Sequence, residues 1–152
     1  MSEIEIRPAR AEDRDAVAAL LEAAALPPDG LDEQFGEAYA GAVADGRVVG
    51  AAGVEVYGDA GLLRSVAVDA AWQGHGLGRR LTEERLRWAT ARGLDSVYLL
   101  TTSAAGYFPR LGFAPAAREE VPAAVRGSLQ FASVCPSTAA VLALRLAPRG
   151  AS

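Results

Sequence analysis

Apolar residues recur along this chain with two different periods, and the change from one to the other marks two adjoining elements. The run Leu62–Val68 is short, largely apolar and contains β-branched valines, a pattern that predicts a buried strand. Farther on, Leu77, Leu81, Arg85 and Trp88 recur at helical spacing, which predicts an amphipathic helix. A strand therefore runs into a helix across residues 69–76.

The size and composition favour one α/β domain. The chain has 152 residues, about half of them apolar and 16 of them glycine, which is enough for one core. We expect a domain over residues 1–147 and a short tail over 148–152. The single cysteine, Cys135, excludes an intrachain disulfide, and with the single histidine, His75, it does not make a zinc site, so no metal is expected.

Charge and hydropathy argue against two classes of partner. The formal net charge is −4, and no basic cluster extends beyond Arg79-Arg80, which argues against non-specific nucleic-acid binding. The apolar runs are shorter than the roughly 18 residues of a membrane span. The N-terminus lacks the basic and then apolar segment of a secretion signal. We therefore expect a cytoplasmic protein.

The residues between the strand and the helix, Gln73-Gly74-His75-Gly76-Leu77-Gly78-Arg79-Arg80, contain three alternating glycines. Glycines at the first turn of a helix let backbone N–H groups approach an anion, and the helix dipole favours negative charge there. The dinucleotide fingerprint is excluded because Arg79 stands where its third glycine belongs, and the Gly-Lys-Ser/Thr ending of a P-loop is absent. A pyrophosphate-binding turn of another kind is predicted.

The remaining pattern, Gln-x-x-Gly-x-Gly after a strand, resembles the acetyl-CoA-binding motif of the GCN5-related N-acetyltransferase (GNAT) superfamily. Further segments match this resemblance in order: a first strand at 4–9, a helix over about 12–25, a hairpin over 43–54 with the turn signal Asp45-Gly46, and Leu111-Gly112-Phe113. The resemblance implies an α+β fold with a mixed, mostly antiparallel sheet of about seven strands flanked by helices. It also implies that the strand ending at Val68 splays from a strand near 97–101.

The same resemblance implies how acetyl-CoA binds as acyl donor. The pantetheine arm pairs with backbone groups of the cofactor strand like an added strand, and a backbone N–H there stabilises the oxyanion of the tetrahedral intermediate. The pyrophosphate meets N–H groups of the glycine turn, which Gln73 orients. The cofactor-binding residues are Val66, Ala67, Val68, Gln73, Gly74, His75, Gly76, Leu77, Gly78 and Arg79.

Three side chains are candidates for catalysis or acceptor binding. Glu55 lies on the strand face opposite Val54 and Val56 and is the candidate base, ahead of Glu119 and Glu120. The family's usual proton donor to the CoA thiolate is a tyrosine, but Phe108 occupies that position, which leaves the adjacent Tyr107 as the candidate acid. Arg64, on the cofactor strand, is a candidate to bind a carboxylate or another oxyanion of the acceptor.

The acceptor class rests on a narrower resemblance. The segments 62–68, 98–102, 121–126 and 133–136 are similar to the small N-acetyltransferases of bacterial arsenic-resistance operons. These relatives suggest a small-molecule amine acceptor, such as an amino acid or an analogue bearing an arsenic or phosphorus oxyacid. A catalytically silent acyl-CoA-binding regulatory domain and a peptide or protein N-acetyltransferase remain alternatives. Family members are often dimers, so a homodimer is left open.

Overall fold

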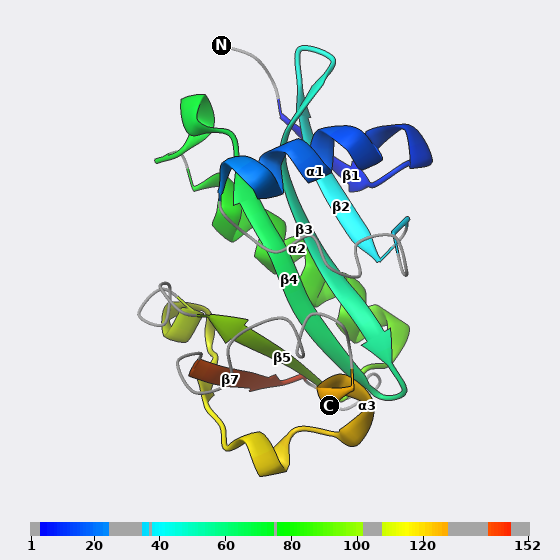
Figure 1. Cartoon of the computed structure of the whole chain (residues 1–152), viewed down its shortest axis with the longest axis vertical. Helices are drawn as coiled ribbons and strands as arrows, with labels where there is room; N and C mark the ends of the chain where they lie inside the picture. Colours follow the sequence, from blue (N-terminus) through cyan, green and yellow to red (C-terminus); the bar gives the residue numbers. More distant parts are fainter. Residues whose placement is uncertain are drawn as a thin grey trace.

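The computed structural model describes residues 4–24, 35–36, 38–74, 76–101, 108–127 and 140–146, and these form a seven-stranded sheet with helices on both faces (Figure 1). The strand order is β1-β2-β3-β4-β5-β7-β6, and every pair is antiparallel except β4 with β5. The predicted α+β class with a mixed, mostly antiparallel sheet is confirmed.

The elements follow the order predicted from the sequence. Four features named from the sequence lie outside the described residues: the tail at 148–152, Cys135, His75 and Tyr107. The strands are β1 (Glu5–Pro8), β2 (Tyr39–Ala44), β3 (Arg47–Tyr57), β4 (Ala60–Val68), β5 (Ser96–Thr101), β6 (Ala114–Pro115) and β7 (Ala140–Arg145); the helices are α1 (Arg14–Ala23), α2 (Leu77–Arg92) and α3 (Ala123–Arg126), with 3₁₀ turns at Ala11–Asp13, Ala70–Trp72, Phe108–Leu111 and Arg118–Glu120.

The β2–β3 hairpin turns at Asp45-Gly46, as the sequence predicts. Both residues have positive φ, 53° and 76°, which a two-residue turn between twisted strands requires. The pairing then shifts, because Val43 faces Val48 whereas Ala42 faces Gly50. This irregularity moves the rest of β2 by one residue along β3.

Helix α2 covers one face of the sheet and lies between two glycines with positive φ, Gly76 before it and Gly93 after it. Leu77 and Leu81 are buried against small residues of β2 and β3. Arg85 continues this stripe and is fully buried, which its charge does not predict. Its guanidinium donates to Glu84 at 2.6 and 2.8 Å and lies 4.8 Å from the centre of the Trp88 ring.

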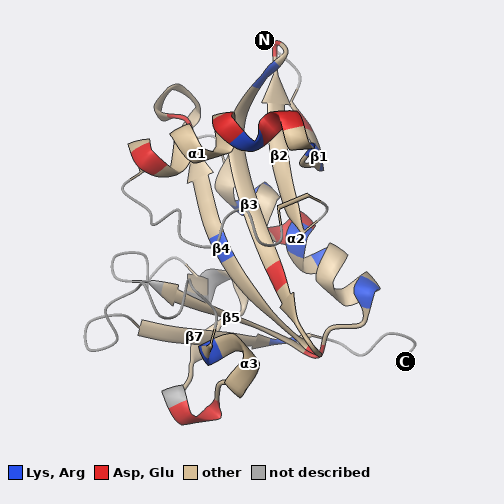
Figure 2. Cartoon of the chain, turned by 45° about the vertical axis from the view of Figure 1, so that its right-hand side comes forward, with Lys and Arg blue, Asp and Glu red and all other residues tan. Residues whose placement is uncertain are grey.

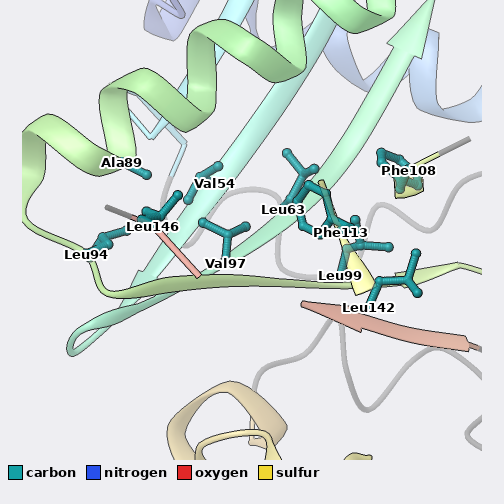
Figure 3. Close-up of a cluster of buried hydrophobic side chains, with 10 residues drawn as sticks. All are labelled: Val54, Leu63, Ala89, Leu94, Val97, Leu99, Phe108, Phe113, Leu142 and Leu146. Carbon is teal, nitrogen blue, oxygen red and sulfur yellow. The ribbon is translucent and has the colours of Figure 1, made fainter. Parts of the chain in front are cut away.

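The hydrophobic core continues on the same face toward β5 and β7. Figure 3 shows this cluster, in which side chains from β3, β4 and α2 meet those of β5 and β7. Its buried members are Val54, Leu63, Ala89, Leu94, Val97, Leu99, Phe108, Phe113, Leu142 and Leu146.

The opposite face of the sheet is covered at its two ends by different helices. Helix α1 packs over β2, β3 and β4 through Val17, Leu20 and Leu21. Helix α3 contributes Val125 to a second cluster with Leu62 and Val141. Figure 1 shows α1 and α3 apart from one another in front of the sheet, with α2 behind it. No helix in the described part of the chain is long and apolar enough to cross a membrane.

Strands β4 and β5 separate after a short stretch of pairing, as the resemblance implies. Their described pairing is limited to Ala60, Gly61 and Leu62 with residues 96–98. Near the same point β4 bulges, because Ala51 pairs with Ala67 and Gly53 with Arg64, so that one residue of β3 faces two of β4. The central strand pair is therefore open toward the end of β4.

Replacing Leu81 with alanine tests the packing of α2 on the sheet. Leu81 is fully buried, so the loss of its side chain leaves a cavity, and we expect the free energy of unfolding to fall by about 3 kcal/mol. The matched control is Arg87→Ala on the exposed side of the same helix, expected to change stability by less than about 0.5 kcal/mol. Urea unfolding of both variants makes the comparison, and equal losses would contradict the packing described.

Candidate functional site

The glycine turn is tied to the end of β4 by side-chain hydrogen bonds. The Asp69 carboxylate accepts from the backbone N–H of Ala71 at 2.9 Å. The Gln73 side-chain amide donates to the Val68 carbonyl at 3.1 Å, so Gln73 orients the loop on the strand, in the manner predicted for it. These hydrogen bonds connect the segment that leads into α2 with the end of β4.

Gly74 and Gly76 give the turn its open inner surface. Their φ angles are 84° and 75°, in the left-handed region that side chains disfavour. A Cβ atom built at either position would meet no atom within 4 Å, so no atom of the described residues crowds the turn at these two glycines. The first N–H groups of α2 point out of the helix end, because such groups have no acceptor within the helix.

A pocket of about 500 Å³ lies in front of this turn. One wall is the end of β4, another is the turn with the start of α2, and Phe108 contributes a third. Its lining is mostly apolar around a positively polarised helix end, which suits an apolar arm attached to a phosphate. The lining residues are Val66, Val68, Trp72, Gln73, Gly74, Gly76, Leu77, Gly78, Arg79 and Phe108.

Arg79 is an exposed side chain at the rim of this pocket. Its Nε atom lies 3.4 Å from Glu83 one helical turn later, and 60% of the side chain is accessible. An exposed pair of this kind contributes little to stability. The Arg79 guanidinium can therefore exchange Glu83 for an anion in the pocket at little cost.

The other face of β3 and β4 carries a buried polar network. Charged residues are scarce on the central strands (Figure 2). Two of them, Glu55 and Arg64, are 2% and 4% exposed, and Arg64 Nη1 lies 3.5 Å from Glu55 Oε2. Arg64 Nε also donates to the Ser65 hydroxyl at 3.0 Å. Ser65 belongs to the β4 bulge and has a φ of 61°, a strained value for a residue with a side chain.

Two tyrosines complete this network. The Tyr39 hydroxyl donates to Glu55 Oε2 at 2.7 Å, and the Tyr57 hydroxyl donates to Glu55 Oε1 at 2.8 Å. Burial raises the pKa of the Tyr39 hydroxyl well above its ordinary value, so the hydroxyl keeps its proton and acts as a donor. The carboxylate is therefore held on both oxygens, and it faces a guanidinium.

The structure brings most of the sequence-predicted site residues into two groups. Eight of the ten predicted cofactor residues line the pocket, and Ala67 lies between two of them on β4. Glu55 and Arg64 lie together on the opposite face. His75 and Tyr107 are outside the described residues.

Sequence reasoning missed Tyr39 and Tyr57. Tyr57 shares a strand face with Glu55 at a spacing of two, a signal that the sequence does contain. Tyr39 is 16 residues away from Glu55, and the hairpin irregularity sets which β3 residues it faces.

A second pocket, of about 630 Å³, lies between α1, the β2–β3 turn and the end of β4. It shares only Val68 and Gln73 with the first pocket and contains neither Glu55 nor Arg64. The candidate base Glu55 and the candidate acceptor-binding residue Arg64 therefore do not line this larger cavity.

The sheet opens beside a glycine turn, as the resemblance to the acetyltransferases implies. The acetyltransferase (GNAT) family matches residues 3–113 of the chain. The chain therefore belongs to the GNAT family of acetyltransferases, whose acyl donor is acetyl-CoA. The resemblance drawn from the glycine motif is confirmed at the level of the superfamily.

Individual relatives share parts of the chain or its fold. Over 71 residues, 47% of this chain, it is 41% identical to an amino-acid acetyltransferase of Pseudomonas fluorescens (strain Pf0-1), of which it covers 16%. Rv2747 from Mycobacterium tuberculosis, solved in complex with CoA and a second compound, is 28% identical with a TM-score of 0.79, and the match covers 94% of this chain and 99% of that one.

An N-acetylglutamate synthase from Neisseria gonorrhoeae, complexed with CoA and N-acetyl-glutamate, has the same fold. The TM-score is 0.81 at 24% identity, and the match covers 97% of this chain and 36% of that one. The chain thus spans about a third of the Neisseria protein and 16% of the Pseudomonas protein.

The raised pKa of Tyr39 predicts how stability depends on alkaline pH. An unfolded tyrosine loses its proton near pH 10, whereas folded Tyr39 keeps it, so the folded state binds more protons above that pH. Stability should then fall as pH rises, by about 1.4 kcal/mol per pH unit from this residue. Urea unfolding at pH 9 to 11 should show a shallower fall in Tyr39→Phe than in the wild type. Equal slopes would contradict the buried, protonated hydroxyl.

Proposed function

We propose that the chain transfers the acetyl group of acetyl-CoA to the primary amine of a small, carboxylate-bearing molecule, by direct attack in a ternary complex. The observation that carries this proposal is the arrangement around β4. A glycine-lined pocket lies on one face, and the buried Glu55–Arg64 pair lies on the other. Both lie near the point where β4 leaves β5.

The residues of the first pocket fit acetyl-CoA. The turn from Gly74 to Arg79 offers backbone N–H groups and open space to the pyrophosphate, with Arg79 available for a charge-assisted contact. The apolar wall formed by Val66 and Val68 suits the pantetheine arm. When bound, acetyl-CoA supplies an activated thioester.

The protein's main contribution is to position the amine against this thioester. Proximity and orientation alone can lower the barrier by about 7 kcal/mol or more. The bulge takes Ser65 and Val66 out of regular pairing with β3, and a backbone N–H of Val66 or Ala67 is our candidate oxyanion donor, a role worth about 3 kcal/mol. Because this donor belongs to the backbone, it does not depend on the side chains at these positions.

Arg64 is the proposed anchor for the acceptor. Its planar guanidinium matches the geometry of a carboxylate or another oxyanion. The acceptors named for two relatives, an amino-acid acetyltransferase and an N-acetylglutamate synthase, support an amino acid as the acceptor class. An amino acid analogue with an arsenic or phosphorus oxyacid is a narrower prediction of the same kind, because such a group would bind the same guanidinium.

Glu55 remains the proposed base. A carboxylate has about four acceptor positions, so two tyrosine hydroxyls and a guanidinium do not prevent it from accepting a proton or an ammonium N–H. Tyr107 remains the proposed acid. The step tolerates its absence, because a thiolate with a pKa of about 8.5 is an adequate leaving group.

One observation favours a second candidate function, a catalytically silent acyl-CoA-binding domain. Phe108, at the position where many family members have the tyrosine, is buried and lines the donor pocket without a hydroxyl. Such a domain would bind acetyl-CoA without turning it over on any amine.

Replacing Gly76 with valine tests the donor site. A side chain there would occupy the space proposed for the pyrophosphate, so we expect acetyl-CoA affinity measured by calorimetry to fall by about a hundredfold, on the order of the loss of one or two hydrogen bonds to a charged group. Gly93→Val is the matched control, because Gly93 has the same left-handed backbone at the other end of α2. Equal affinity in both variants would refute the proposed turn.

An acceptor panel tests the proposed reaction. With acetyl-CoA, we expect turnover on free amino acids, slower turnover on the corresponding decarboxylated amines, and little on short peptides. Arg64→Lys keeps the charge but loses the planar fork, so it should reduce kcat/KM for amino acids more than for simple amines. Turnover confined to peptides would favour the protein N-acetyltransferase alternative, and binding without any turnover would favour the silent domain.

A further inference from the structure

We infer that Tyr39 is a positioning residue for the acceptor, acting through Glu55 and Arg64. This inference rests on the proposed function and extends it to a residue outside the glycine turn and the cofactor strand. Tyr39 is the first residue of β2 and is fully buried. Tyr39 does not line the donor pocket, so an effect on acceptor binding that leaves acetyl-CoA affinity unchanged would point to the Glu55–Arg64 network.

The Tyr39 ring is held in one place by its strand neighbours. Tyr39 pairs with Gly53 on β3, and a Cβ atom at Gly53 would lie 2.5 Å from the ring, so the ring lies directly over the glycine. On its other side the ring lies 5.3 Å from that of Phe35, measured between ring centres. Burial also keeps the hydroxyl protonated. Tyr39 is therefore a rigid donor with one available direction.

That direction is toward the carboxylate oxygen that also contacts the arginine. Glu55 Oε2 accepts from Tyr39 at 2.7 Å and lies 3.5 Å from Arg64 Nη1, whereas Tyr57 bonds the other oxygen. Tyr39 thus holds Glu55 Oε2, the oxygen that contacts the Arg64 guanidinium. Since Arg64 Nε is joined to Ser65, the guanidinium is fixed between Glu55 and the β4 bulge.

The chemistry of this contact predicts a specific kinetic signature. Without the Tyr39 hydroxyl, the Glu55 carboxylate and the Arg64 guanidinium are no longer held in one position. Binding of an acceptor carboxylate then has to order both groups, which lowers its affinity. The acceptor KM should rise, while acetyl-CoA binding on the opposite face should not change. If Tyr39 only stabilised the fold, its replacement would weaken acceptor binding and acetyl-CoA binding together.

The test compares Tyr39→Phe with Tyr57→Phe. The control is Tyr98→Phe, which removes a tyrosine hydroxyl from β5 in the cluster that also contains Tyr57. With the best amino acid of the acceptor panel, we expect Tyr39→Phe to raise the acceptor KM about tenfold or more, the effect of losing a hydrogen bond to a charged group. Its acetyl-CoA Kd should change much less. Tyr57→Phe should raise the KM less, and Tyr98→Phe should leave both constants unchanged.

An unchanged acceptor KM in Tyr39→Phe, or a parallel loss of acetyl-CoA affinity, would overturn the inference and leave the proposed function intact. If the wild type acetylates no amino acid, the proposed acceptor class fails and the inference fails with it. Gly53→Ala supplies a second route if Tyr39→Phe does not fold, because it displaces the ring and keeps the hydroxyl. It should raise the acceptor KM in the same way, and an unchanged KM would count against Tyr39.

Discussion

The separation of β4 from β5 is the constraint on which the rest of the structure depends. The two strands pair over three residues and then diverge, so the backbone of β4 beyond Leu62 is left beside an opening rather than beside another strand. Buried backbone groups need hydrogen-bond partners, and an extended ligand arm can supply them in place of a strand. The glycine turn lies at the end of this opening and the buried network lies behind it. One departure from regular pairing therefore places both halves of the site.

The site contains features that cost stability. Ser65 adopts a left-handed backbone conformation, which costs about 1–3 kcal/mol for a residue with a side chain. Glu55 and Arg64 are a buried charged pair, and such pairs are often no more stabilising than apolar residues of similar size. Both features lie at the β4 bulge and are held by the hydrogen bonds of Tyr39, Tyr57 and Ser65. Their common location agrees with a functional role.

The sequence predicted those parts of the fold that depend on local chemistry. Asp45-Gly46 predicted its hairpin, and the alternating glycines predicted the turn before α2, where Gly74 and Gly76 adopt positive φ angles that glycine accommodates best. The sequence did not predict the Tyr39–Glu55 contact, which depends on a one-residue shift in hairpin pairing that leaves no mark in composition. It did not predict the strained Ser65, because serine does not mark the left-handed region as glycine does. The spacing of Arg85 places it on the apolar stripe of α2, but its charge did not predict its burial; Glu84 and stacking on Trp88 satisfy that charge.

The most direct test of this account is amide hydrogen exchange, measured residue by residue with and without acetyl-CoA. We predict slower exchange on binding at Val66–Val68, where β4 faces the opening, and at Gly76–Arg79, where the helix begins. Amides lining the larger pocket under α1, between Glu12 and Ala24, should not change. Protection confined to α1, or no protection at β4 and the glycine turn, would contradict the claim that the opened strand and the turn hold the acyl donor.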